Sequence, residues 1–252
     1  MTPFAETVVI AAFLAFCRIG GCFMIMPGLS SARLPLQIRL FLALAISAAL
    51  VVNLWDQIVP FVDRRPAILV PMIASELLIG GLIGLLARVY MMALQFMGSA
   101  IAMMVGYGGM SGSGIESGEP EPALGAMISF SALMLLFVFN FHHEIVRALV
   151  ESYTVAPINL AFKPQAALVD LTDTLSESFF IMLRIGSPFI AYALLVNLTI
   201  GFINKLTPQI PVYFISLPFV VAGGLFILYF AVATMLSLIV DGFLPTTIGR
   251  AL

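Results

Sequence analysis

The chain has 252 residues, of which 62% are hydrophobic and only 10% are charged. A soluble domain carries about 25% charged residues, so too few polar side chains are present to cover a water-facing surface of this size. The formal net charge of -2 gives no electrostatic signature of a nucleic-acid partner. These values predict an all-helical membrane protein of one domain, covered by lipid or by partner subunits.

Apolar runs long enough to cross a bilayer recur along the chain. A spanning helix needs about 20 mainly apolar residues, and the pattern predicts six long helices, at residues 4–26, 38–55, 67–105, 123–152, 167–205 and 211–240. The third and fifth are too long for a perpendicular crossing, so each extends past the bilayer, bends, or packs as a hairpin. Pro71, Pro188 and Pro218 are the expected kinks.

The first apolar segment has none of the features of a removed signal peptide. No basic residue precedes it, and Pro27 and Gly28 follow it in place of a cleavage site, so we expect a retained helix. Its cysteines, Cys17 and Cys22, match no metal or haem signature and are expected to be small packing residues.

Two charges, Arg18 and Glu76, lie inside apolar runs. A charge at membrane depth costs several kcal/mol, of order 3 or more, unless it is paired or hydrated. Each is therefore a candidate functional residue, expected to pair with the other or with a partner subunit. The plain structural interpretation is a pair that locks helices together or a side chain that extends to the membrane interface. Gly80 and Gly84 form a G-x-x-x-G pattern on the segment that contains Glu76, which predicts a close helix–helix contact but no activity.

His142, His143 and Glu144 are predicted to end the fourth helix at the membrane interface. Adjacent histidines point to different faces, and no H-E-x-x-H pattern is present, so a metal site is disfavoured. No Ser-His-Asp or Cys-His grouping has a suggestive context. We therefore expect no enzyme activity, catalytic residue, metal or cofactor.

Residues 166–183 have an amphipathic pattern. Apolar side chains recur at helical spacing from Leu168 to Met182, and Asp170, Asp173 and Glu177 share the other side. Two interpretations remain open: a helix end rising out of the lipid, or a contact with another subunit.

Residues 106–122 form the most unusual segment, rich in Gly and Ser, with Glu116, Glu119 and Glu121 and no basic residue. No phosphate-binding G-x-x-x-x-G-K-[ST] pattern is present. Composition alone favours a flexible linker over a movable plug in a protein-lined cavity.

Several stretches, taken together and in order, form a recognisable pattern. Phe16 to Gly21 contains Arg18 and is followed by Pro27 and by a Leu-Pro-Leu-Gln-Ile-Arg segment that ends at Arg39. Glu76 with Gly80 comes next, then the series His143, Ser152 and Pro157. The most distinctive stretch runs from Gly201 to Pro218 and contains Pro208 and Gln209. Nearly end to end, the sequence resembles the FliR family of flagellar export-apparatus proteins and their injectisome counterparts.

The resemblance implies a subunit of the type III export gate in the bacterial inner membrane, at the flagellar basal body. It implies assembly with FliP-like and FliQ-like subunits, contact with FlhB-like and FlhA-like export proteins, and passage of unfolded secreted proteins. It also implies a FliP-like part at 1–165 and a FliQ-like part at 166–252, built from helical hairpins.

The resemblance reverses the preference for a linker, because in this family the matching loop plugs the closed pore. The implied plug residues are Gly106, Tyr107, Gly108, Gly109, Met110, Ser111, Gly112, Ser113, Gly114, Ile115 and Glu116. The implied structural motif positions are Arg18, Pro27, Arg39, Glu76, Gly80, Pro208 and Gln209. The rival from another class is a stand-alone small-solute transporter, in which Arg18 and Glu76 mark a midplane site and the helices break at Pro188 and Pro208.

Overall fold

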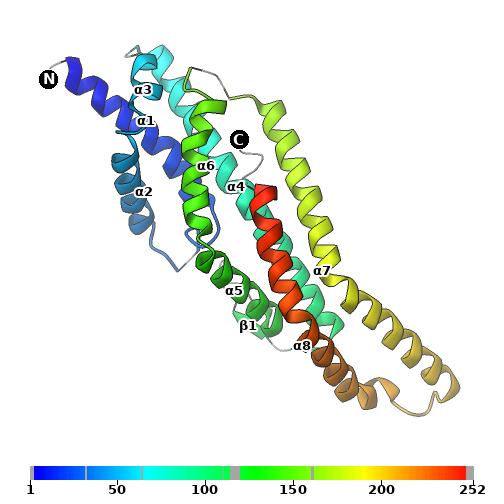
Figure 1. Cartoon of the computed structure of the whole chain (residues 1–252). Helices are drawn as coiled ribbons and strands as arrows, with labels where there is room; N and C mark the ends of the chain where they lie inside the picture. The colour runs from blue at the N-terminus through cyan, green and yellow to red at the C-terminus, as the bar shows by residue number, and fades with distance from the viewer. Residues whose placement is uncertain are drawn as a thin grey trace.

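The structure is a computed structural model that describes residues 3–31, 33–63, 65–109, 111–113, 120–159 and 162–247. Nearly all of this is helical (Figure 1). The elements in chain order are α1 (Pro3–Ile25), α2 (Leu36–Leu50), α3 (Trp55–Ile58), the 3-10 turn η1 (Val59–Phe61), α4 (Pro66–Met104), β1 (Ser111–Ser113), β2 (Pro120–Pro122), α5 (Ala123–Val138), α6 (Phe141–Val155), α7 (Pro164–Leu206) and α8 (Val212–Thr247).

Helix α4 is the centre of the fold, and it packs against α1, α5, α7 and α8. Close contacts of Gly80 with Arg18 and of Gly84 with Cys22 show that α1 runs beside α4 in the same direction. Helices α7 and α8 form an antiparallel hairpin whose tip extends away from the other helices, at the lower right of Figure 1. The result is an elongated molecule rather than a compact bundle.

The expected class, an all-α polytopic membrane protein, is confirmed. Four helices, α1, α4, α7 and α8, are long and apolar enough to cross a membrane, and up to six spans result if each bent helix pair counts as one. Within the described residues, the only strands form a small antiparallel ribbon in which Gly112 faces Glu121.

The two longest segments are continuous helices, of 39 residues in α4 and 43 in α7. The alternative that either one folds into a hairpin is therefore wrong. Pro71 and Pro188 lie inside these helices, and Pro218 lies inside α8, without ending them. A proline inside a membrane helix is tolerated because neighbouring helices, Ser or Thr side chains and local adjustments of the backbone satisfy the carbonyl that it leaves without a partner.

Two predicted helices are broken in the structure. The segment 123–152 divides at Asn140, whose φ of +60° is left-handed, and α6 turns 64° away from α5. The segment 38–55 ends at Leu50, and α3 with η1 lies at 93° to α2. The bend after α2 buries Leu54 and Ile58 beside α1. This burial depends on tertiary contacts, which hydropathy along the chain does not reveal.

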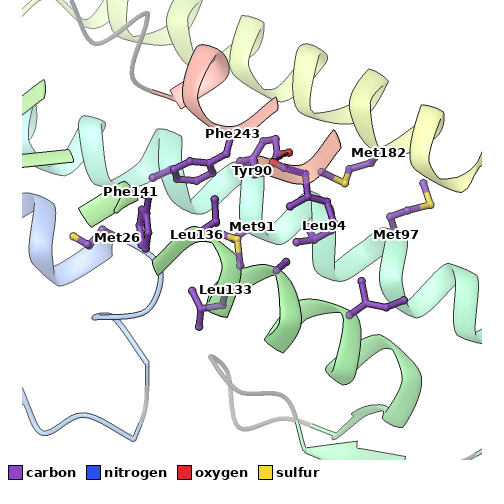
Figure 2. Packing of buried hydrophobic residues seen from close by; sticks show 14 of the residues in the cluster. Met26, Tyr90, Met91, Leu94, Met97, Leu133, Leu136, Phe141, Met182 and Phe243 are labelled. Atoms are coloured by element: carbon purple, nitrogen blue, oxygen red, sulfur yellow. Dashed lines mark hydrogen bonds between the residues drawn. The ribbon is translucent and has the colours of Figure 1, made fainter. Parts of the chain in front are cut away.

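The main core lies where six helices meet around α4 (Figure 2). Phe243 stacks edge-on against both Tyr90 and Phe141, with ring centroids 5.3 and 5.5 Å apart. The Tyr90 hydroxyl donates to the carbonyl of Ile239 at 2.7 Å, so its polar end is satisfied inside the core. A smaller cluster joins α1, α3, α4 and α6 next to the buried polar groups described below.

Candidate functional site

Arg18 and Glu76, the two charges inside apolar helices, pair with each other. The guanidinium of Arg18 reaches the Glu76 carboxylate through two bonds, Nη2 to Oε1 at 2.6 Å and Nε to Oε2 at 2.8 Å. The exposed fractions of the two side chains are 0% and 1%. A fork-shaped pair of this kind satisfies both charges at once, which is the arrangement that makes a buried ion pair tolerable.

The remaining donors of Arg18 bind the end of α6. Nη1 donates to the Ser152 hydroxyl at 3.0 Å, and Nη2 donates to the Ala156 carbonyl at 2.8 Å. The guanidinium carbon also lies 3.8 Å from the ring centroid of Tyr153. Because the carbonyls at a helix C-terminus carry partial negative charge, Arg18 acts as a cationic cap on α6.

This polar cluster therefore fastens three helices, α1, α4 and α6. Its hydrogen bonds use the carboxylate of Glu76, and its side chains are closed off from solvent. An arrangement of this kind resists separation of the helices but presents no reactive group to a substrate. The geometry favours the structural interpretation of Arg18 and Glu76 over a transport site.

The G-x-x-x-G pattern lies directly beside the cluster, and the predicted close contact is confirmed. A Cβ at Gly80 would collide with the carbonyl oxygen of Arg18, and one at Gly84 would lie 2.5 Å from the carbonyl of Cys22. From the other helix, a Cβ at Gly21 would lie 2.7 Å from the Leu77 carbonyl. Only glycine permits this approach, which brings Arg18 within reach of Glu76.

The Gly-rich loop begins with a defined helix cap. Gly106 has a φ of +84°. Its N–H donates to the carbonyl of Met103 at 3.1 Å, and the N–H of Tyr107 donates to the carbonyl of Ala102 at 2.8 Å. These two bonds form the Schellman motif that ends many helices, and the left-handed residue in it is normally glycine. The loop therefore leaves α4 at a fixed point and angle.

The loop returns to α4 through the β1–β2 ribbon. Gly112 lies against Ala123, where a Cβ would be 2.9 Å from the Ala123 Cα. The Ser99 hydroxyl on α4 donates to the Glu121 carboxylate at 3.3 Å. Burial raises the pKa of Glu121, and the hydrogen bond from Ser99 partly offsets that rise. The ends of the loop are thus tied down on one side of α4.

The other predicted positions are spread over the molecule. Arg39 donates to the carbonyls of Ser31 and of Leu34, the second at 2.9 Å, and so closes the turn between α1 and α2. Pro27 is buried in that turn, whereas Pro208 and Gln209 are exposed in the turn between α7 and α8. Of the predicted plug residues, Gly106, Tyr107, Gly108, Gly109, Ser111, Gly112 and Ser113 lie in described segments, and Met110, Gly114, Ile115 and Glu116 lie outside the described residues.

Two sequence interpretations need correction or refinement. His142, His143 and Glu144 begin α6 and do not end a helix, because the chain breaks at Asn140. On α7 the stripe of Leu168, Leu175 and Phe179 is exposed, and the side that packs inward carries Ala167, Thr174, Ser178 and Met182. Within the described residues, no group of three or more His, Cys, Asp or Glu side chains is placed to hold a metal ion.

Sequence reasoning missed the α6 half of the polar cluster. Ser152 belongs to the quoted motif series, but its role as an acceptor for Arg18 was not predicted, and Tyr153 and Ala156 were not singled out. A signal was present in the chemistry of arginine. Its five N–H donors need more acceptors than one carboxylate supplies when the side chain is buried.

The fold and the buried cluster define a class: a polytopic helical membrane protein held together by a buried ion pair, with an anchored Gly-rich loop. The model of the family "Bacterial export proteins, family 1" matches residues 9–245, and the chain belongs to that family. It is 28% identical to the flagellar biosynthetic protein FliR of Caulobacter vibrioides over 220 residues, which is 87% of each chain.

Other relatives are similar over almost the whole chain. The FliR protein of Aquifex aeolicus is 28% identical over 89% of this chain and 86% of its own. The FliR protein of Bacillus subtilis is 22% identical over 94% of this chain and 92% of its own. The resemblance seen in the sequence motifs is confirmed, and the chain is a membrane-embedded component of the flagellar export apparatus.

Proposed function

We propose that this chain is a subunit of the flagellar type III export gate in the bacterial inner membrane. In this proposal it assembles with FliP-like and FliQ-like subunits around a passage for unfolded flagellar proteins, with FlhB-like and FlhA-like proteins as neighbours. The segment 1–165 takes the place of a FliP-like unit, and 166–252, which contains the α7–α8 hairpin, takes that of a FliQ-like unit. The flagellar names of the relatives favour this assignment over the injectisome.

The observation that carries the proposal is the length over which apolar side chains are exposed. Phe41 on α2 is 71% exposed and Val52 is 72% exposed, at one end of the molecule. At the α7–α8 tip, Leu206 is 80% exposed and Phe214 and Phe219 are each 75% exposed. Figure 1 shows that these regions lie far apart along the molecule.

A single bilayer is too thin to cover both regions. At about 1.5 Å per residue, the 43 residues of α7 span about 65 Å, whereas the hydrocarbon layer is about 30 Å thick. An apolar surface that extends beyond the lipid must be covered by protein to remain soluble. Partner subunits are the natural cover, since the family works in protein export.

The loop fits the role of a movable plug with fixed ends. Its start is set by the cap at Gly106, and its return is set by the ribbon and by the contact of Ser99 with Glu121. Within the described residues the ribbon consists of two strands of three residues each, so displacing it costs little. A plug of small residues closes a passage by steric filling. It offers no side chain that would select among unfolded chains, which suits a general export route.

In this mechanism the chain supplies structure and gating, and no chemical step. The buried Arg18–Glu76 pair keeps α1, α4 and α6 at fixed positions relative to one another. The helices that carry the two ends of the loop therefore hold the loop at the passage. Energy for transport then comes from partner proteins or from the proton gradient. The rival transporter is disfavoured because its proposed midplane charges are closed off and engaged with each other.

Co-purification separates the two functions. An affinity-tagged chain, expressed with its FliP-like and FliQ-like neighbours, is expected to elute as one complex and to be degraded or aggregated when expressed alone. A monodisperse, stable monomer in lipid nanodiscs that moves small solutes without partners would refute the proposal.

A further inference from the structure

The β1–β2 ribbon has a fixed hydrogen-bond pattern, because β2 contains two prolines. Three residue pairs face each other across the ribbon: Ser111 with Pro122, Gly112 with Glu121, and Ser113 with Pro120. Along an antiparallel pair of strands, opposite residues alternately exchange both backbone hydrogen bonds or direct their N–H and C=O groups away from each other. Proline lacks the N–H that an exchange requires. The exchange therefore falls on Gly112 and Glu121.

The two outer edges of the ribbon consequently differ. On β1, the N–H and C=O groups of Ser111 and Ser113 point outward, so this edge offers donors and acceptors at the spacing of a strand. On β2, the outward groups belong to Pro120 and Pro122, which supply carbonyls but no donors. Apart from the bonds of the ribbon, and within the described residues, no backbone hydrogen bond is found for Ser111 or Ser113. The edge of β1 can thus accept a further strand, whereas the edge of β2 is blocked.

Contacts with α4 and α5 position the ribbon without using the β1 edge. The Ser99 hydroxyl on α4 donates to the Glu121 carboxylate at 3.3 Å. A Cβ at Gly112 would lie 2.9 Å from the Cα of Ala123, at the start of α5. Directly opposite residues of an antiparallel pair share one face of the ribbon, so Gly112 and Glu121 define the face that lies against the helices. The outward backbone groups of β1 take no part in these contacts.

The chemistry of this edge indicates what it can bind. A row of backbone donors and acceptors is matched by another extended backbone, as in strand addition to a sheet edge. The residue types of β1 are small, Ser-Gly-Ser, so recognition through this edge depends on backbone and not on side chains. The strand is only three residues long, and each hydrogen bond changes a binding constant by a factor of about two to ten. Binding of this strength is transient, which suits a moving chain better than a permanent subunit contact.

We infer that the β1 edge binds an extended segment of a polypeptide in transit, which adds to the ribbon as a short-lived third strand. The inference rests on the proposed export function and deepens it, because it assigns the class of contact made with the secreted chain. An unfolded chain has unpaired backbone groups to offer, whereas a folded protein has already used most of its own in secondary structure. Backbone pairing is also independent of sequence, as passage of many different proteins requires.

Disulfide cross-linking to a stalled substrate tests the inference. The full chain with Ser113→Cys is produced with its partner subunits, and co-purification and export are verified first. A flagellar substrate is halted at a fixed register by a folded domain at its C-terminal end, and a cysteine is moved along the segment that precedes this domain. We expect the cross-linking yield to rise and fall at alternate substrate positions, because successive side chains of a strand point to opposite faces. The native Cys17 and Cys22 are buried, so they add no background.

Two variants distinguish the edges of the ribbon. Ser111→Pro removes an outward N–H from β1 and is expected to lower the cross-linking yield by about two- to tenfold, as the loss of one hydrogen bond implies. Pro120→Ala is the matched control, since it changes an exposed residue of β2 and leaves every donor of β1 in place. No change is expected from it. The alternating pattern is measured without either variant, so it decides the question even if Ser111→Pro disturbs the ribbon.

Three results would overturn the inference while export itself is intact. The first is a cross-linking yield that does not alternate along the substrate, and the second is a yield that Ser111→Pro leaves unchanged. The third is that Ser113→Cys cross-links to a partner subunit or to a second copy of this chain in place of the substrate. Failure of the proposed export function is distinct from all three, because it would appear earlier, as loss of co-purification or of export.

Discussion

Arg18 on α1 and Glu76 on α4 face each other through two hydrogen bonds, of 2.6 and 2.8 Å, in a site closed to solvent. The same arginine caps α6 through the Ala156 carbonyl. One side chain therefore fixes three helices, and the loss of either partner leaves the other charge buried without compensation.

Glu76→Gln is expected to lower the free energy of unfolding by about 3–5 kcal/mol, because it leaves the Arg18 charge buried and unpaired. Equilibrium unfolding in detergent or nanodiscs measures this. The double variant Arg18→Met with Glu76→Leu is expected to recover much of the loss, since two apolar side chains remove both charges.

Arg147→Gln is the matched control for the ion pair. Arg147 and Glu151 form a pair on α6 at 2.8 Å, but their side chains are 69% and 37% exposed. Exposed pairs contribute little to stability, so no measurable change is expected. Equal losses for Glu76→Gln and Arg147→Gln would contradict the structural role assigned to the buried pair.

Gly80→Ala and Gly201→Ala test the close contact of α1 with α4. A Cβ at Gly80 collides with the Arg18 backbone, whereas nothing lies within 4 Å of a Cβ at Gly201. The first change is expected to destabilise the protein by about 1–3 kcal/mol through overpacking. The second is expected to stabilise α7 by about 0.5–1 kcal/mol, as alanine does in place of helical glycine.

The two glycine variants are best compared in one unfolding experiment, with cross-linking between α1 and α4 as a second readout. Gly80→Ala is expected to reduce the cross-linking yield, because the helices must separate. If both variants unfold alike, the close contact does not govern stability.

Glu121 is expected to make the ribbon sensitive to pH. Burial raises the pKa of this carboxyl, so the docked ribbon binds a proton more tightly than the undocked loop does. Docking is therefore strongest below the ordinary pKa of a glutamate, and that stability is lost as the pH rises through the elevated value. Hydrogen exchange across residues 106–122, measured over this interval, is expected to speed up with rising pH by more than the base-catalysed exchange of an unprotected amide does.

Glu121→Gln is the control for this pH dependence. A neutral amide still accepts a hydrogen bond from Ser99 but does not titrate, so exchange in the ribbon is expected to lose its additional pH dependence. An unaltered profile in that variant would show that another group controls the ribbon.

Much of the fold could be predicted from the sequence, because hydropathy reports which segments avoid water. The long helices α4, α7 and α8 and the glycine contact at Gly80 follow from apolar length and small-residue spacing. The breaks at Asn140 and after Leu50 were missed, since a bend depends on tertiary packing, which the hydropathy of a segment does not report. The left-handed conformation of Asn140 leaves no mark in a hydropathy pattern.

The polar cluster was only half predictable. Two charges in apolar runs point to each other because neither is tolerated alone, and this identified Arg18 and Glu76. The acceptors on α6 lie 134 or more residues away from Arg18 along the chain, and a serine or a backbone carbonyl looks ordinary in a sequence. The role of the loop as a plug came from family resemblance and stays a prediction.

Ion conductance of the assembled gate tests the central proposal most directly. The complex is purified with wild-type chain or with a chain that lacks residues 108–117, and each is reconstituted into planar bilayers after its subunit content is verified. The shortened loop is expected to leave the gate leaking ions, while the wild type stays closed. Equal, low conductance in two correctly assembled complexes would contradict the claim that this loop closes a shared passage.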